Sequence, residues 1–266
     1  MDSNIGTTLP LLDQSWLKLR RAKEHFYSLN AAINVFWDSK PNAVVHEYDT
    51  EKSKNLFRFK VLRDVPYESW GMVIGDLVHN ARSALDYLAW RLAGSDIEDI
   101  RTQFPICLTA KKFDDVRWRL KLIHPDAFAE ISKLQPYTRP NPKEHALWFL
   151  QELDARDKHK LITVTKHITN AARYSASLPY ATTIPMSGIG KIEADAPLIE
   201  ITGPCDPDMD VTIHLASTVL FEQGIISEAD DYEALPCLGQ VCDVVEGVLL
   251  VFDRLLRAHP DWIRNA

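Results

Sequence analysis

Apolar residues recur at helical spacing over four long stretches of this chain. In one of them, Leu77, Ala81, Ala84 and Leu88 follow one another in steps of three or four residues, which places them on one face of a helix. The four patterns predict long helices over 12–38, 66–94, 144–162 and 236–258. Two weaker patterns predict shorter helices near 110–122 and 125–134.

Between the helices the period changes to two. Apolar and polar residues alternate on both sides of the polar turn 49–55, which predicts a β-hairpin over 43–63. A second region, about 163–234, combines turn residues with short alternating runs, and its clearest predicted strand pair is 197–202 with 210–216. We therefore expect an α+β protein that is mainly α. The prediction is one domain over 1–266, a bundle of four long helices with a small inserted antiparallel sheet.

The composition agrees with a soluble globular protein. Of 266 residues, 46% are hydrophobic and 25% are charged, close to the average for such proteins. The four cysteines form no CxxC pair, so we expect reduced thiols, no metal site and no cofactor. The longest uncharged stretch, 174–190, is interrupted by Pro and Gly, and the first residues lack the pattern of a secretory signal. We expect a cytoplasmic protein that does not enter a membrane.

The charge is unevenly distributed along the chain. The formal net charge is -7, but residues 101–173 hold 14 Lys and Arg against 8 Asp and Glu, and residues 192–253 hold 14 acidic residues and no basic one. The two regions either face each other, within one chain or across a homodimer, or the basic region binds a phosphate-bearing ligand. The acidic total argues against a reader of duplex DNA.

Common catalytic signatures are absent from the sequence. It contains no phosphate-binding glycine loop, no Gly-x-Ser-x-Gly elbow and no His-Glu-x-x-His. Asp206, Asp208 and Asp210 resemble the start of a calcium loop, but Val211 stands where that loop needs Gly. We interpret these residues as an acidic turn.

The predicted helix 66–94 carries a polar stripe opposite its apolar face. At about 100° per residue, His79, Arg82 and Asp86 fall within an arc of about 60°, and Asp76 and Ser83 lie on the same side. Such a stripe is either a solvated helix face or one wall of a polar site.

The predicted helix 144–162 places a carboxylate at a core position. Its inward stripe consists of Ala146, Leu150, Leu153, Asp157 and Leu161. An ionised Asp157 there is costly without a cation, so we expect it to pair with Arg82 in preference to His79. The pair is either a structural contact that fixes the helix register or part of a polar pocket, unless the helix frays after Asp157. The neighbouring polar residues are Asp154, Lys158 and His159.

These segments also carry a resemblance. Residues 79–88 read HNARSALDYL and 157–159 read DKH, with FPI at 104–106 and QPY at 135–137. The blocks resemble a family of uncharacterised bacterial proteins, over about 65–165, in which His is common at the position of Tyr87. Arg, four residues, then His is similar to the signature of the HEPN superfamily. Those proteins are helical bundles, often dimeric and metal-independent ribonucleases, whose His is the acid or base and whose Arg stabilises the phosphate.

The resemblance implies a ribonuclease or RNA-binding protein of the toxin or defence type. Only Arg82 carries over directly, because Tyr87 replaces the His, and His79 or His159 would have to substitute for it. We expect Asp157 to hold the cation, and Asn80, Asp86, Asp154 and Lys158 to contribute to ligand binding. The alternative is a non-catalytic helical scaffold or ligand- or partner-binding module whose polar cluster is a structural ion-pair network.

Overall fold

The computed structural model describes residues 12–94, 102–160, 162, 164–169, 174–177, 197–204, 210–213, 216–222, 226 and 232–263. Contacts group the chain into two compact units. Unit 1 comprises Met1–Leu29, Glu68–Thr163 and Gln223–Ala266, and unit 2 comprises Asn30–Tyr67 and Val164–Glu222. Whether the two units fold together as a single domain stays a prediction.

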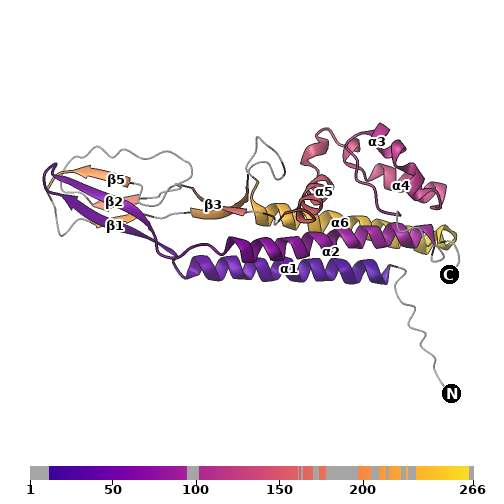
Figure 1. The fold of residues 1–266 in the computed structure, drawn as a ribbon, viewed down its shortest axis with the longest axis horizontal. Helices are drawn as coiled ribbons and strands as arrows, with labels where there is room; N and C mark the ends of the chain where they lie inside the picture. Colours follow the sequence, from indigo (N-terminus) through magenta and orange to yellow (C-terminus); the bar gives the residue numbers. More distant parts are fainter. Residues whose placement is uncertain are drawn as a thin grey trace, which may run out of the picture. The chain divides into compact units, whose positions relative to one another are not determined.

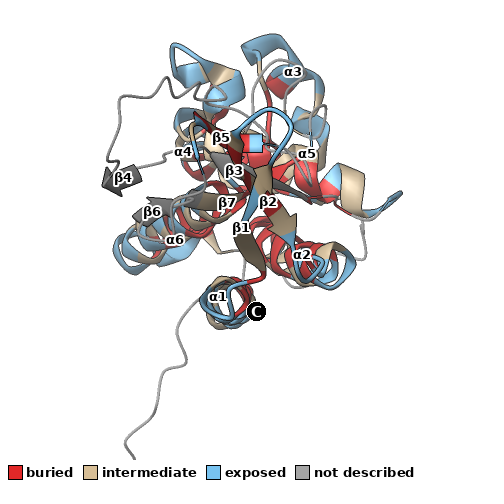
Figure 2. Ribbon diagram, turned by 90° about the vertical axis from the view of Figure 1, so that its left-hand side faces the viewer, coloured by how far each residue is buried: buried red, intermediate tan, exposed pale blue. Residues whose placement is uncertain are grey.

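Unit 1 is helical. Three of its helices are long: α1 (Asp13–Asp38), whose end continues into unit 2, α2 (Tyr67–Ala93) and α6 (Ala234–Ala258). They run alongside one another (Figure 1), and each shows a buried and an exposed side (Figure 2). The fourth predicted long helix is shorter than expected, because α5 spans only Ala146–Asp157. The mainly α class is confirmed, whereas a bundle of four long helices is not.

The apolar stripes form the core of unit 1 as their spacing predicts. In α2, Leu77, Ala81, Leu85 and Leu88 are fully buried, and in α6 Val245 and Phe252 are too. The interior of α2 also contains Gly75, whose lack of a side chain lets α5 approach closely.

A set of short helices follows α2. It comprises α3 (Ala110–Asp115), η1 (Arg117–Leu120), α4 (Pro125–Lys133), η2 (Pro136–Thr138) and η3 (Pro142–Glu144). Thr109 caps α3, and imidazole nitrogens of His124 and His145 accept backbone N–H bonds at the starts of α4 and α5. These caps satisfy donors that the first helical turn leaves without partners. Another short helix, η4 (Pro260–Trp262), follows α6.

Unit 2 contains antiparallel sheets. Strands β1 (Asn42–Asp49) and β2 (Lys54–Val61) form the predicted hairpin, and β5 (Pro197–Thr202) pairs with the other edge of β2. Two separate pairs are β3 (Val164–Thr169) with β7 (Ala216–Phe221) and β4 (Tyr174–Ser177) with β6 (Asp210–Ile213).

The expected pairing of 197–202 with 210–216 is wrong. Strand β5 joins β2 instead, where Ile199 lies directly opposite Phe57 and both side chains are buried. Cross-strand apolar pairs of this kind stabilise a sheet. The free edge of β2 therefore binds β5 in place of the segment 210–216, which is nearer to β5 in the sequence. The residues of the predicted acidic turn lie mostly outside the described part, which includes only Asp210.

One described helix bears on membrane insertion. By length and composition alone, α6 could cross a membrane, with a mean hydropathy of 1.7 over its most apolar window and 44% of that window buried. The core helix of a soluble protein passes the same test, so this is weak evidence.

Candidate functional site

The polar stripe of α2 is organised around Arg82. This residue is only 8% exposed. Its Nε donates to Asp86 Oδ2 at 3.3 Å and its Nη2 to Asp86 Oδ1 at 2.8 Å. The two residues are four positions apart on one helix, a spacing that brings opposite charges together. The two residues form a bidentate salt bridge, and such charge-assisted hydrogen bonds are stronger than neutral ones.

The Arg82–Asp86 pair also holds the backbone of the extended segment 102–107. Arg82 Nη2 donates to the carbonyl oxygen of Phe104, and the Phe104 N–H donates to Asp86 Oδ1 at 2.9 Å. On the other side of this segment, the fully buried Gln135 accepts from Cys107 N at 3.0 Å and donates to Pro105 O at 2.9 Å. The blocks at 79–88, 104–106 and 135–137 therefore meet in one hydrogen-bond network.

Several groups shift the pKa of the Asp86 carboxyl group in opposite directions. Burial raises its pKa, whereas the charge of Arg82 and the bond from Phe104 N–H lower it, and Asp154 raises it further. The net direction is upward from the ordinary value, because desolvation penalises the ionised form. Asp154 therefore lies close enough to couple α5 to the α2 stripe.

On α5 the buried carboxylate is Asp154 and not Asp157. Asp154 is 3% exposed, and Lys158 Nζ donates to its Oδ2 at 2.6 Å. Asp157 is half-buried and ends the helix. Its carboxylate lies over Gly75, so near that a Cβ added there would sit 2.3 Å from Asp157 Oδ1.

The expected Asp157–Arg82 pair is wrong. Arg82 takes its carboxylate from its own helix, where Asp86 is held at the right distance without ordering a second element. Both acidic and basic side chains lie near the Asp157 carboxylate. Burial raises its pKa, Asp154 and Asp76 raise it further, and His79 and Lys158 lower it. The helix end at Asp157 also corrects the predicted helix 144–162, since Lys158–Lys160 form a turn.

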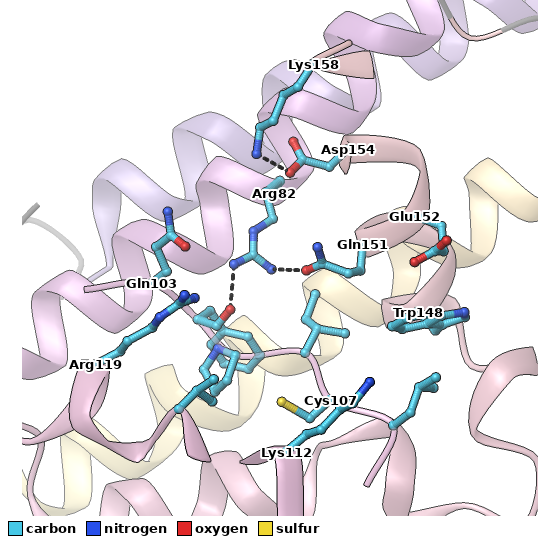
Figure 3. Close-up of a pocket in the computed structure, with 15 residues that line it drawn as sticks. Arg82, Gln103, Cys107, Lys112, Arg119, Trp148, Gln151, Glu152, Asp154 and Lys158 are labelled. Carbon is cyan, nitrogen blue, oxygen red and sulfur yellow. Dashed lines mark hydrogen bonds and ion pairs between the residues drawn. The ribbon is translucent and has the colours of Figure 1, made fainter. Parts of the chain in front are cut away.

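A pocket lies beside the Arg82 network (Figure 3). It encloses about 290 Å³ between segment 103–108, α3, η1 and α5. The charged side chains that line it are Arg82, Lys112, Arg119, Glu152, Asp154 and Lys158. Figure 3 shows Arg119 and Gln103 on one side and Glu152 and Trp148 on the other, with Arg82 between them.

The charges of this pocket are unequally paired. Arg82 is bound to Asp86, and Lys158 to Asp154. Within the described part of the chain, Lys112 and Arg119 have no carboxylate within 4 Å. Both of them, with Arg82, lower the pKa of the buried Cys107 thiol, although its burial raises that pKa more. The charges of these three pocket cations therefore all act on this thiol.

Glu152 faces this pocket from α5. Burial raises the pKa of its carboxyl group, while Arg156 and Lys143 lower it, and the net direction is upward. Desolvation is the largest cause, because burial penalises the charged form of the carboxyl group.

The remaining predicted site residues lie away from the pocket lining. His79 is exposed, and so is His159 in the turn after α5. Asn80 donates to Asp76 O on its own helix at 2.7 Å and is contacted by Lys18 from α1 at 3.5 Å. Lys18 also lies over the ring of Tyr87, at 5.8 Å from its centroid. The structure thus brings together Arg82, Asp86, Asp154 and Lys158, but places the two histidines outside this group.

Sequence reasoning missed four residues of this site. Lys112 and Arg119 belong to the basic region 101–173, but no periodic pattern distinguished them from its other cations. Gln135 was quoted only as part of a short block, and Glu152 resembled any polar residue on a helix. Of these four residues, only Gln135 could have been recognised from the sequence. Its amide precedes Pro136 at a helix end, where it is well placed to bond backbone groups that lack a partner.

Among the described residues, no cluster of three or more His, Cys, Asp or Glu could hold a metal ion. No family model matches the sequence, and the searches of curated proteins and of solved structures also found no match.

Proposed function

We propose that unit 1 is a binding module for a phosphate-bearing ligand, and that its helices act as a bundle-like scaffold for the pocket. The observation that carries this proposal is the pairing of the pocket charges. Two cations are neutralised by their own carboxylates, whereas Lys112 and Arg119 face the cavity without one among the described residues. A phosphate offers several acceptor oxygens and enough charge to engage both cations together with the outer edge of Arg82.

The Arg82–Asp86 pair has a supporting role in this proposal. Arg82 Nη1 makes only a long bond of 3.5 Å to Gln151 Oε1, so this nitrogen can exchange that bond for one to a ligand oxygen at little cost. The other nitrogens stay bound to Asp86 and Phe104, which fixes the guanidinium plane before a ligand arrives. A preoriented donor loses less entropy on binding.

Calorimetric titration with inorganic phosphate, acetate and a ten-nucleotide single-stranded RNA tests the proposal. We expect phosphate and RNA to bind and acetate to bind more weakly. Lys112→Gln and Arg119→Gln should each weaken phosphate binding about tenfold, which corresponds to about 1.4 kcal/mol. Lys111→Gln is the matched control, because the exposed Lys111 adjoins Lys112 but does not line the pocket.

Two results would contradict the proposal. One is the absence of phosphate binding at low salt. The other is an equal loss of affinity in Lys111→Gln and Lys112→Gln, which would indicate general electrostatic attraction.

Metal-independent RNA cleavage is a second candidate function. It is favoured by the coupling of His79 to Asp157, since an imidazole beside a carboxylate is a common acid–base arrangement. His79 lies about one helical turn from Arg82 along α2. If the protein cleaves RNA, His79→Ala should abolish cleavage in excess chelator without changing the melting temperature, whereas His159→Ala should retain activity. No cleavage by the unmodified protein of any RNA tested would eliminate this candidate.

A further inference from the structure

One exposed face of α1 carries two apolar side chains with two opposite charges between them. This α1 face consists of Leu17, Arg20, Glu24 and Tyr27, which follow one another in steps of three, four and three residues. At about 100° per residue, the four side chains fall within an arc of about 80°. Leu17 is 49% and Tyr27 63% exposed, and the two charged residues are exposed as well. The face therefore takes no part in the core of unit 1, to which this portion of α1 belongs.

The contacts that the α1 face makes within its own chain leave it open. Glu24 accepts from Arg21 at 3.0 Å, but these two side chains are 53% and 59% exposed, and a pair so exposed contributes little to stability. Tyr27 meets the neighbouring ring of Phe26 in an edge-to-face arrangement and stays mostly exposed. Among the described residues, Arg20 has no carboxylate within 4 Å. The α1 face can therefore bind a partner without breaking a contact of the core.

A hollow of about 550 Å³ adjoins the α1 face. It lies between α1 and α6, which are joined by an ion pair of Lys23 with Glu246 at 2.8 Å, and three members of the α1 face line it. On α6, Glu246 and Asp253 also line the hollow. Leu250 lies between them on the same side of the helix, at steps of four and three residues, and is 52% exposed. Exposed apolar side chains of both helices therefore border the hollow.

The order of side chains on the α1 face is complementary to itself. In a two-fold symmetric dimer the same surface of both copies meets, so two antiparallel helices bring together residues that are equally distant from the axis. With the axis at the level of residue 22, Arg20 of each copy lies opposite Glu24 of the other. Leu17 of each copy then lies opposite Tyr27 of the other. The steps of three and four residues are those of the contact positions in paired helices.

The charges also exclude the neighbouring arrangements. A shift of one helix by four residues would bring Arg20 opposite Arg20 or Glu24 opposite Glu24, and a parallel pair in register would do both. Like charges placed opposite each other oppose association. An unrelated partner requires no such two-fold order, whereas a second copy of the chain does.

We propose that the α1 face binds a second copy of this chain in an antiparallel homodimer. Two ion pairs of Arg20 with Glu24 form its centre, two contacts of Leu17 with Tyr27 flank them, and the second copy covers the hollow beside Leu250. This surface is separate from the phosphate pocket, whose lining residues lie on neither α1 nor α6. Arg20 and Glu24 also lie outside the charged regions 101–173 and 192–253.

Sedimentation equilibrium of the full chain tests the inference with charge reversals. We expect the unsubstituted protein to dimerise. Arg20→Glu and Glu24→Arg should each weaken the dimer at least about tenfold, because either change places like charges opposite each other in both central pairs. The double variant Arg20→Glu/Glu24→Arg should regain the original affinity. Lys111→Glu is the matched control, since it changes the net charge as much as Arg20→Glu does, at an exposed site on α3, and should leave the dimer intact.

A mixture of the two single variants provides the sharpest comparison. Arg20→Glu chains and Glu24→Arg chains should form heterodimers with each other, because every central pair then joins opposite charges again. A monomeric unsubstituted protein at concentrations up to about 1 mM, or a dimer that both single reversals leave intact, would overturn the proposal. If the double variant and the mixture stay monomeric, Arg20 and Glu24 do not face each other and the antiparallel arrangement is wrong.

Discussion

Arg82 shows how one residue connects distant parts of a chain. It neutralises Asp86 on its own helix and binds the backbone carbonyl of Phe104, 22 residues further along. Removal of the cation would leave a largely buried carboxylate and a backbone carbonyl without their donor. Loss of one partner from a buried pair costs more than the pair contributes, because the remaining charge stays desolvated.

We therefore predict that Arg82→Ala lowers the free energy of unfolding by about 3 kcal/mol, measured by urea denaturation. The control is Arg21→Ala, which removes an arginine from an exposed pair with Glu24 on α1 and should cost less than about 0.5 kcal/mol. Similar small effects of both substitutions would mean that the Arg82 network does not stabilise the fold.

The contact of Gly75 with Asp157 provides a second test at the residue scale. Gly75→Ala would ordinarily stabilise a helix interior by about 0.5–1 kcal/mol, but here the new methyl group meets a carboxylate oxygen. We predict a loss of about 1–2 kcal/mol from this overpacking. Asp157→Ala should be nearly neutral, since its carboxylate is disfavoured by burial and by two nearby acids.

The two substitutions should not be additive. In an Asp157→Ala background, Gly75→Ala should become neutral or stabilising, which gives a coupling energy of about 1–3 kcal/mol in a double-mutant cycle. An unchanged effect of Gly75→Ala in that background would show that α2 and α5 do not meet at this point.

At the scale of an element, α6 holds two buried thiols whose ionisation opposes folding. Burial raises the pKa of Cys237 from its ordinary value near 9 to about 12, and that of Cys242 to about 11. Above pH 9 the unfolded chain loses these protons while the folded chain keeps them. The stability that they contribute is complete below pH 9 and is lost as the pH rises toward their folded values.

We predict that the free energy of unfolding falls between pH 8.5 and pH 10, and that a Cys237→Ala/Cys242→Ala variant loses less over the same range. Urea denaturation at each pH measures both slopes, and the comparison removes the contribution of other titrating groups. Equal slopes in the two proteins would show that these thiols do not remain protonated in the folded state.

For the whole molecule, the uneven charge of the chain remains a prediction about assembly. Residues 101–173 have a formal balance of +6 and residues 192–253 a balance of -14. If these regions meet between two copies, the homodimer should weaken when salt is added, because exposed charges are screened beyond about 8–10 Å at ordinary ionic strength. Sedimentation velocity at low and high salt measures this. A monomer at every salt concentration would exclude the intermolecular contact.

The amino-acid sequence by itself determined most of the local structure. The helices α1, α2 and α6 and the hairpin of β1 and β2 lie close to where the periodicity predicts them, because apolar spacing is a local property that each element must satisfy to bury one face. The polar stripe of Arg82 and Asp86 also follows from their spacing on a helix, but the pattern led us to pair Arg82 with Asp157 and not with Asp86.

Only the tertiary structure decided which groups meet. Asp157 fitted the inward stripe of its helix, yet the helix ends there and the buried acid is Asp154. The pocket draws on residues from 82 to 158, and Gln135 bridges backbone groups of Pro105 and Cys107. Periodicity specifies the face of an element but not its partner. The choice of partner depends on distances between elements that are far apart in the sequence, because hydrogen bonds and ion pairs form only at short range.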